Sequence, residues 1–183
     1  MTPEEFNRLF DEVTESAFRF EGLPEYAVDE EDPDLRAWRE GLPQAERSVR
    51  TSPWLARIAR QTVVEGVDWS RVRYAPSPLP WYLRWEVGGY IESQAAGERI
   101  LLTSDRSAWD GPDFWLFDAD RNNARAVLMY YDDHGAQAGY EPVTDDAALA
   151  RLRVASATLV EAAAPLNWWL VEHAHEIHQA GAA

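Results

Sequence analysis

The chain of 183 residues contains no cysteine and no lysine, so all seventeen of its Lys/Arg-type residues are arginine. Without cysteine there can be no disulfide, no thiolate nucleophile and no cysteine-ligated zinc or iron–sulfur site. The sequence also lacks a run of roughly 18 apolar residues that could span a bilayer, and its start has neither the basic stretch nor the apolar run of a secretory signal. We therefore expect a cytoplasmic protein that makes no contact with a membrane.

The common sequence signatures of catalysis are also missing. There is no nucleophile elbow with Ser, His and Asp, no phosphate-cradling glycine loop and no dinucleotide fingerprint. We predict no cofactor, and a function without catalysis is favoured.

Charge is distributed unevenly along the chain, whose net charge is −15. Residues 1–46 have a balance of −10, residues 47–106 a balance of +3, and residues 107–183 a balance of −8. A basic middle rich in Trp and Tyr is thus flanked by two acidic regions. The overall charge argues against nonspecific attraction to duplex DNA or anionic lipid, so any contact with nucleic acid would have to be local.

The length and the 46% apolar content predict one folded domain over residues 1–183. We divide it into an acidic helical region (1–46), a basic aromatic core (47–143) and a C-terminal helix (144–183). Helix starts occur at Thr2-Pro3, with a helix to about Ser16, at Asp32-Pro33 and at Ser52-Pro53.

The core reads as a βαβ unit followed by a meander. A strand at 71–75, a helix closed by Gly97 and a strand at 99–103 form the unit, whose crossover should be right-handed, and strand candidates follow at 114–117, 126–131 and 137–141. Pro165 should break or kink the last helix. We predict an α+β fold: a mixed, mostly antiparallel sheet of about five strands with one βαβ crossover, N-terminal helices and a long kinked C-terminal helix. Residues 17–21 could be a further short extended piece.

Four segments occur in a familiar order: Trp81–Glu86, Ala95–Ile100, Asp113–Asp118 and Met129–Gly135. Together, over about residues 6–178, they resemble an uncharacterised actinobacterial domain family with an aromatic Trp-Glu helix, AGE-x-I and DFWLFD strands and an M-x-Y-D-x-x-G hairpin. The resemblance brings no activity. Members are often encoded beside small helix-turn-helix regulators, so it implies a regulatory or interaction role.

The arginines and aromatics of the core suggest a binding surface. Arg47, Arg50, Arg57 and Arg60 recur at intervals of 3, 7 and 3, so most could share a helical face. Arginine binds phosphate or carboxylate through its planar fork, and bases stack on Trp or Tyr. The alternative is that these arginines pair with the acidic flanks and the tryptophans form the core. The candidate binding residues are Arg57, Arg60, Arg73, Tyr82, Trp85, Glu86, Asp113, Trp115, Tyr130 and Asp132.

Glu86 follows Tyr82 by one helical turn and precedes Gly89 by three residues. With Arg73 on the preceding strand, these groups could form a polar pocket with an acid/base group. A buried Arg73–Glu86 pair that fixes the helix on the sheet is the other interpretation.

Metal binding is not predicted. Four carboxylates at the ends of predicted strands could bind a divalent cation: Asp113, Asp118, Asp132 and Asp133. Aspartate is common in turns for other reasons, however. The histidines at 173, 175 and 178 lack zincin spacing and suit a helix C-terminus.

Two functions remain open. The first is a regulator-associated interaction module without catalysis, which binds a partner with a basic surface such as a helix-turn-helix regulator. The second is an enzyme or binder acting on a nucleotide or single-stranded nucleic acid through an Arg/Tyr/Trp/Glu pocket.

Overall fold

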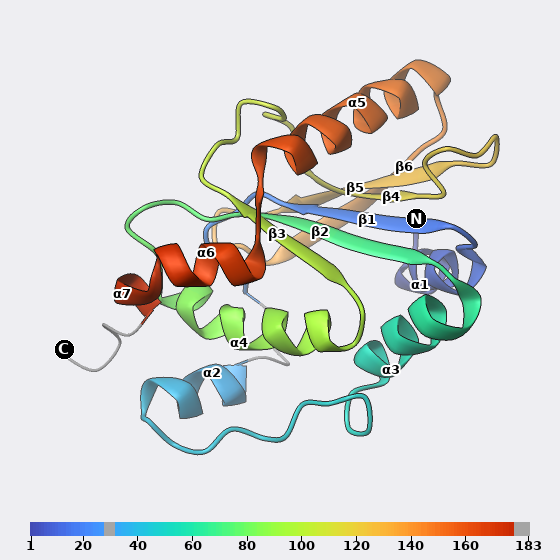
Figure 1. Cartoon of the computed structure of the whole chain (residues 1–183). Helices are drawn as coiled ribbons and strands as arrows, with labels where there is room; N and C mark the ends of the chain where they lie inside the picture. The colour runs from blue at the N-terminus through green and yellow to red at the C-terminus, as the bar shows by residue number, and fades with distance from the viewer. Residues whose placement is uncertain (28–31, 178–183) are drawn as a thin grey trace.

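A seven-stranded mixed sheet lies at the centre of the molecule, in the order β6-β5-β4-β1-β2-β3-β7 (Figure 1). The computed structural model describes residues 1–27 and 32–177, so residues 28–31 of the acidic N-terminal region, and the histidine at 178, lie outside the described residues. The strands are β1 Ser16–Glu21, β2 Asp68–Tyr74, β3 Arg99–Thr103, β4 Asp113–Phe117, β5 Arg125–Tyr131, β6 Gln137–Val143 and β7 Ala164–Pro165. The helices are α1 Pro3–Glu12, α2 Asp32–Arg39, α3 Pro53–Arg60 with a π-helical extension η1 Gln61–Glu65, α4 Trp81–Ala95, α5 Asp146–Ala162, α6 Leu166–Glu172 and α7 Ala174–Ile177.

The α+β class and the antiparallel meander β4-β5-β6 are confirmed, but the predicted strand number and the single crossover are wrong. β1 pairs in parallel with β2, and β2 pairs in parallel with β3, so there are two parallel connections. The segment expected only as a short extended piece is β1, which lies between β2 and β4 in the middle of the sheet. Residues 17–21 are buried on both faces of the sheet, including the charged Arg19 and Glu21, so the charged side of the strand faces the interior rather than solvent.

The C-terminal region is broken rather than kinked. α5 ends at Ala162, the two residues of β7 pair with β3, and α6 begins at Leu166. Pro165 lacks an N–H and holds the residue before it in an extended conformation. Ala164 and Pro165 can therefore form an edge strand but cannot continue the helix.

Helix boundaries follow from local hydrogen bonds. Thr2 and Glu5 form a capping box at the start of α1, as the sequence indicates. The helix ends at Glu12, earlier than predicted, and the next amides bond elsewhere. The buried Asp118 carboxylate accepts hydrogen bonds from the backbone N–H groups of Thr14, Glu15 and Ser16, at 3.0, 2.7 and 3.2 Å. These bonds turn the chain into β1.

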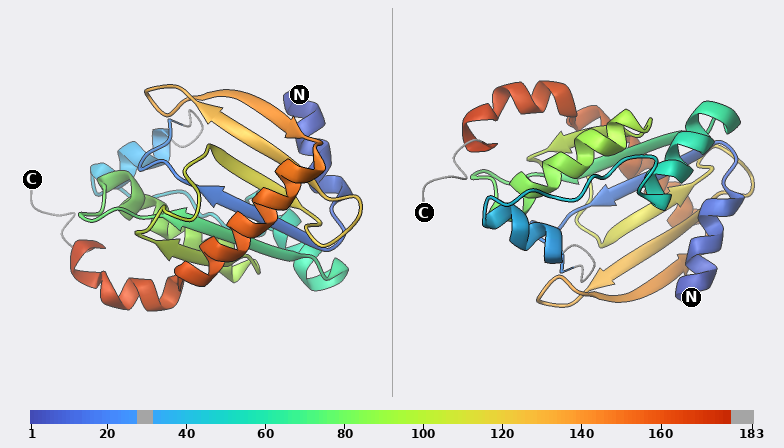
Figure 2. Two further views of the ribbon diagram at one scale, coloured as in Figure 1. Left: turned by 90° about the horizontal axis from the view of Figure 1, so that it is seen from above. Right: turned by 90° about the horizontal axis from the view of Figure 1, so that it is seen from below.

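The sheet has two covered faces (Figure 2). On one face, which we call the α5 face, Phe20, Phe114 and Leu116 pack with Leu152 and Leu159 of α5. The opposite face, the α4 face, is covered by α1, α3, α4 and α6 and contains two apolar clusters. Each fully buried Phe or Leu contributes roughly 1.5–3 kcal/mol through the hydrophobic effect. Within the described residues, no helix combines the length and apolar character required to cross a membrane.

Candidate functional site

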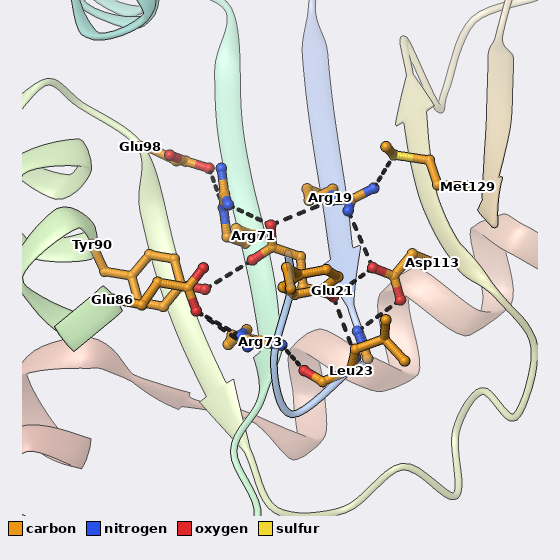
Figure 3. Close-up of polar contacts among 12 residues, drawn as sticks. Arg19, Glu21, Leu23, Arg71, Arg73, Glu86, Tyr90, Glu98, Asp113 and Met129 are labelled. Carbon is orange, nitrogen blue, oxygen red and sulfur yellow. Dashed lines mark hydrogen bonds and ion pairs between the residues drawn. The ribbon is translucent and has the colours of Figure 1, made fainter. Parts of the chain in front are cut away.

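Charged side chains gather in the middle of the α4 face (Figure 3). Residues 19 and 21 of β1 lie in register with residues 71 and 73 of β2. Because alternate residues of a strand point to the same face, these four side chains share one side of the sheet. With Glu86 of α4, Glu98 before β3 and Asp113 of β4 they form what we call the charge cluster, whose members are Arg19, Glu21, Arg71, Arg73, Glu86, Glu98 and Asp113.

Glu21 lies at the centre of the charge cluster. Its carboxylate accepts hydrogen bonds from Arg71 Nη1 at 2.6 Å and from the Tyr90 hydroxyl at 2.9 Å, and Arg19 Nε lies 3.5 Å away. Burial by itself would raise the pKa of Glu21, but Arg71, Arg19 and Arg73 outweigh burial and lower that pKa to about 2. Glu21 is therefore an ionised, buried carboxylate at neutral pH. The same burial raises the pKa of the Tyr90 phenol, which stays a hydrogen-bond donor.

Asp113 joins β4 to the charge cluster. It accepts hydrogen bonds from the Gly22 N–H at 2.9 Å, the Tyr26 hydroxyl at 2.5 Å and Arg19 Nη2 at 3.1 Å. Burial raises the pKa of Asp113 even though Arg19 and the two other donors act in the opposite sense. Arg19 also donates to the Tyr131 hydroxyl at 2.9 Å. Burial would lower the pKa of Arg19, but Tyr131, Asp113 and Glu21 outweigh it, so that the guanidinium stays charged.

Arg73 and Glu86 form an ion pair, one of the two arrangements that the sequence left open. Arg73 Nε and Nη2 both lie 3.1 Å from the same Glu86 oxygen, and the Arg73 side chain is 0% exposed. The other guanidinium donors reach the backbone carbonyls of Leu23 and Pro24. Tyr82 Oη lies 3.5 Å from the second Glu86 oxygen. The pair fixes α4 on the sheet.

Arg71 connects Glu21 to Glu98. Its Nε donates to Glu98 Oε1 at 2.9 Å. The other oxygen, Glu98 Oε2, is buried and has no hydrogen-bond partner among the described residues. Unpaired buried acceptors are uncommon in folded proteins, because they lose hydration without replacement.

Two cavities adjoin the charge cluster under the segment that links α2 to α3. The outer one, of 270 Å³, is lined by Asp34, Gln44, Ala45, Arg47, Trp85, Glu86, Gly88, Gly89 and Glu92. The inner one, of 240 Å³, is lined by Arg47, Trp54, Arg71, Glu86, Gly89, Tyr90 and Ser93. Both therefore touch Arg47, Gly89 and Glu86 of the charge cluster, and the inner one also reaches Arg71.

The structure brings together four of the ten candidate residues predicted from sequence. Arg73, Glu86 and Asp113 belong to the charge cluster, and Tyr82 contacts it through Glu86. Trp85 lines the outer cavity.

The other candidates are dispersed. Arg57 pairs with Asp11 of α1 at 2.9 Å, and Arg60 pairs with Glu65 one turn further along its own helical segment. Trp115 belongs to the aromatic core beside α1, and its ring centroid lies 5.5 Å from the guanidinium carbon of Arg19 at the edge of the charge cluster. Tyr130 is exposed on β5, and Asp132 accepts turn hydrogen bonds from residues 134 and 136. Because α3 begins at Pro53, Arg47 and Arg50 precede the helix, and the four arginines do not share one helical face.

Sequence reasoning did not single out Arg19, Glu21 and Glu98 as site residues, and it considered Arg71 and Arg47 only within the arginine-rich region. A usable signal existed in β1, where Arg19 and Glu21 alternate with Phe18 and Phe20. Charged residues at alternate positions of a strand with aromatics between them indicate one apolar and one charged face.

No cluster of three or more potential metal ligands occurs in residues 1–27 and 32–177. Instead, His173 stacks on Trp169 with ring centroids 4.3 Å apart, and its Nδ1 lies 3.0 Å from Glu176.

The fold and the site define an α+β protein with a mixed sheet whose α4 face holds a buried charge cluster beside two cavities. The chain belongs to a family described as a domain of unknown function, DUF6879, whose model matches residues 4–171. No curated protein matches the chain.

Proposed function

We propose that the protein is an interaction module without catalysis, which binds a partner with a basic surface such as a helix-turn-helix regulator. The observation that carries the proposal is the placement of charge. Eight of the seventeen arginines form ion pairs within the described residues, and two of them, Arg19 and Arg73, are buried in the charge cluster. The acidic excess of the chain is thereby left to its exterior.

Ion pairs at the surface neutralise further arginines, each with one carboxylate. Arg121 pairs with Glu15 and Arg125 with Glu12, both across long stretches of sequence. An acidic exterior steers a basic partner into encounter and penalises an acidic one, an effect that weakens as salt increases. This favours a basic protein over a nucleic acid as the partner.

The hairpin of β5 and β6 offers a specific contact surface. Tyr130 is 40% exposed and donates a hydrogen bond to Glu141 at 2.6 Å. Asp132 and Asp133 are exposed at the turn of the same hairpin, and β6 is an edge strand. A partner arginine could stack on the Tyr130 ring while its fork reaches Glu141. We name these four residues, Tyr130, Asp132, Asp133 and Glu141, the hairpin surface.

The choice of a DNA-binding regulator rests on the resemblance to an actinobacterial family whose members are often encoded beside such regulators. Such proteins carry basic surfaces for phosphate contact. The lack of cysteine suits a reducing cytoplasm, where these regulators act.

The test is capture of a helix-turn-helix protein from the source organism by the tagged chain, at low and at high salt. The double variant Tyr130→Ala/Glu141→Lys should lose the partner, and Glu161→Lys, an equal charge reversal at an exposed position of α5, should retain it. Recovery of the same proteins by all three chains, or of housekeeping proteins alone, would rule out the proposal.

The alternative function is binding of a nucleotide or single-stranded nucleic acid through Arg73, Tyr82, Trp85 and Glu86. Arg73 of β2 and Tyr82 of α4 are buried, whereas Trp85 and Glu86 line the outer cavity. The geometry suits a small molecule better than a strand. A short single-stranded oligonucleotide should leave the melting temperature unchanged if the interaction module is the correct function, since a bound ligand stabilises the folded state.

A further inference from the structure

We propose that the inner cavity binds a small organic anion, a carboxylate or phosphate monoester attached to a flat ring, with Arg47 and Arg71 as its anion-binding groups. The proposal does not depend on the hairpin surface, which uses other residues.

Arg71 forms the base of this site. Two of its nitrogens are occupied, Nε by Glu98 at 2.9 Å and Nη1 by Glu21 at 2.6 Å. Its third nitrogen, Nη2, has no hydrogen-bond partner among the described residues. The guanidinium carbon lies 5.6 Å from the centroid of the Tyr90 ring, and the side chain lines the cavity and is 12% exposed. The two carboxylates hold the guanidinium in place. Nη2 is therefore a preorganised donor, which loses little conformational entropy when it binds an anion.

Arg47 lies at the boundary between the two cavities, because it lines both of them. Its side chain is 42% exposed, and its Nε lies 3.7 Å from Glu92, a long contact for an ion pair. The guanidinium rests on the backbone of α4, where a Cβ at Gly89 would lie 2.7 Å from Arg47 Nη1. A loosely held arginine can turn toward an entering anion. That movement would join the cavities into a space at the lower end of the range for ligand pockets.

The remaining walls suit a flat ring. Trp54 and Tyr90 line the inner cavity with aromatic surface, and Ser93 contributes a hydroxyl that makes no hydrogen bond with another described residue. Aromatic rings favour offset or edge-on contact with other rings, and a hydroxyl can donate to a carboxylate or phosphate oxygen.

The charges determine how strong such binding would be. The charge cluster and Arg47 together contain four guanidinium groups and four carboxylates. An anion thus enters a site without net positive charge, and its affinity comes from directed N–H donors. We expect weak affinity for fragments and a strong dependence on each donor.

The test uses the full ¹⁵N-labelled chain and the indole N–H signal of Trp54, assigned with Trp54→Phe. The probes are benzoate, phenyl phosphate, benzamide and benzamidine, which share a ring but differ in charge. Benzoate or phenyl phosphate should shift the signal saturably, and the comparison of the two identifies the preferred anion. Benzamide and benzamidine should cause no saturable shift. Absence of a saturable shift with either anion, or tighter binding of benzamidine, overturns the proposal.

Variants then test the assigned groups. Arg47→Gln removes one donor charge and should weaken binding of the preferred anion about tenfold, and Ser93→Ala should weaken it less. Arg50→Gln, at an exposed arginine of the same segment, is the control and should bind like the wild type. Gly89→Ala should alter binding because it displaces Arg47, whereas Gly88→Ala adds a Cβ in open space and should not. Equal affinity in the Arg47 and Arg50 variants would overturn the role of Arg47.

Discussion

Arg19 and Arg73 are buried and Arg71 is 12% exposed, and each of the three is paired. An isolated charge in a low-dielectric interior costs several kcal/mol even after relaxation, and opposite charges with good hydrogen-bond geometry offset that cost. Arg19, Arg71 and Arg73 each contact at least one carboxylate, and Arg73 also reaches two backbone carbonyls. Removal of one partner should therefore be costly, since the other charge stays buried.

Glu86→Gln tests this at a single residue. The change keeps the size of the side chain but leaves the fully buried Arg73 without its carboxylate, so the free energy of unfolding should fall by about 2–4 kcal/mol. Urea denaturation measures it. Glu92→Gln, on the rim of the outer cavity in the same helix, is the matched control and should cost less than about 1 kcal/mol. Equal unfolding free energies for Glu86→Gln and the wild type would show that the pair has no stabilising role.

At the scale of elements, helix ends decide where strands begin. η1 ends at Gly66, with φ of +76°, and α4 is followed by Gly97, with φ of +112°. Both glycines adopt backbone conformations that disfavour a side chain, and each lies just before a strand of the parallel set. They differ in their surroundings: a Cβ at Gly66 would meet nothing within 4 Å, whereas one at Gly97 would lie 2.5 Å from Thr62 Oγ1.

This difference gives a prediction for the two elements. Gly66→Ala should destabilise the protein by about 1–2 kcal/mol, the usual cost of a left-handed non-glycine residue. Gly97→Ala should cost more than Gly66→Ala, because Thr62 must also move away from the Ala96 carbonyl to which it donates at 3.3 Å. Thermal and urea unfolding of the two variants measure the comparison. The prediction fails if Gly97→Ala is as stable as Gly66→Ala or more so.

At the scale of the whole molecule, the charge cluster makes stability depend on pH. The Glu21 pKa is about 2 in the folded protein, against 4.5 for a free side chain. Its contribution is present above the unfolded value and is lost as the pH falls from about 5 toward 2, which is worth roughly 3 kcal/mol. Asp113 acts in the opposite sense, because burial raises its pKa and its neutral form suits the fold at low pH.

Glu21→Gln should therefore flatten the acid limb of the stability curve. The unfolding free energies of the variant and the wild type should differ most near neutral pH and converge as the pH falls from about 5 toward 2. Urea unfolding at several pH values measures this, and Glu161→Gln serves as the control for loss of one negative charge. A constant difference between the Glu21 variant and the wild type across that range would contradict the assigned role of Glu21.

Much of the local structure could be predicted from the sequence because its causes are local. Helix starts at Thr2 and Ser52, the stop at Gly97 and the helix break at Pro165 each depend on side chains within a few residues. The meander was predictable for the same reason, since its strands are joined by short turns. The Arg73–Glu86 pair could also be predicted, because a strand followed directly by a helix leaves few other charged residues that could face each other.

Only the tertiary structure decided the position of β1 and the composition of the charge cluster. β1 is separated from β2 and β4 by long stretches of chain, and no local sequence pattern indicates which strands it pairs with. That pairing brings Arg19 and Glu21 beside Arg71 and Asp113. An arginine of the basic middle, Arg71, thereby pairs with a carboxylate of the acidic N-terminal region, Glu21. The sequence by itself determined the helix starts, the antiparallel meander and the excess of acid, whereas long-range pairing decided which charges are buried, because the cost of burying a charge depends on its partners in space.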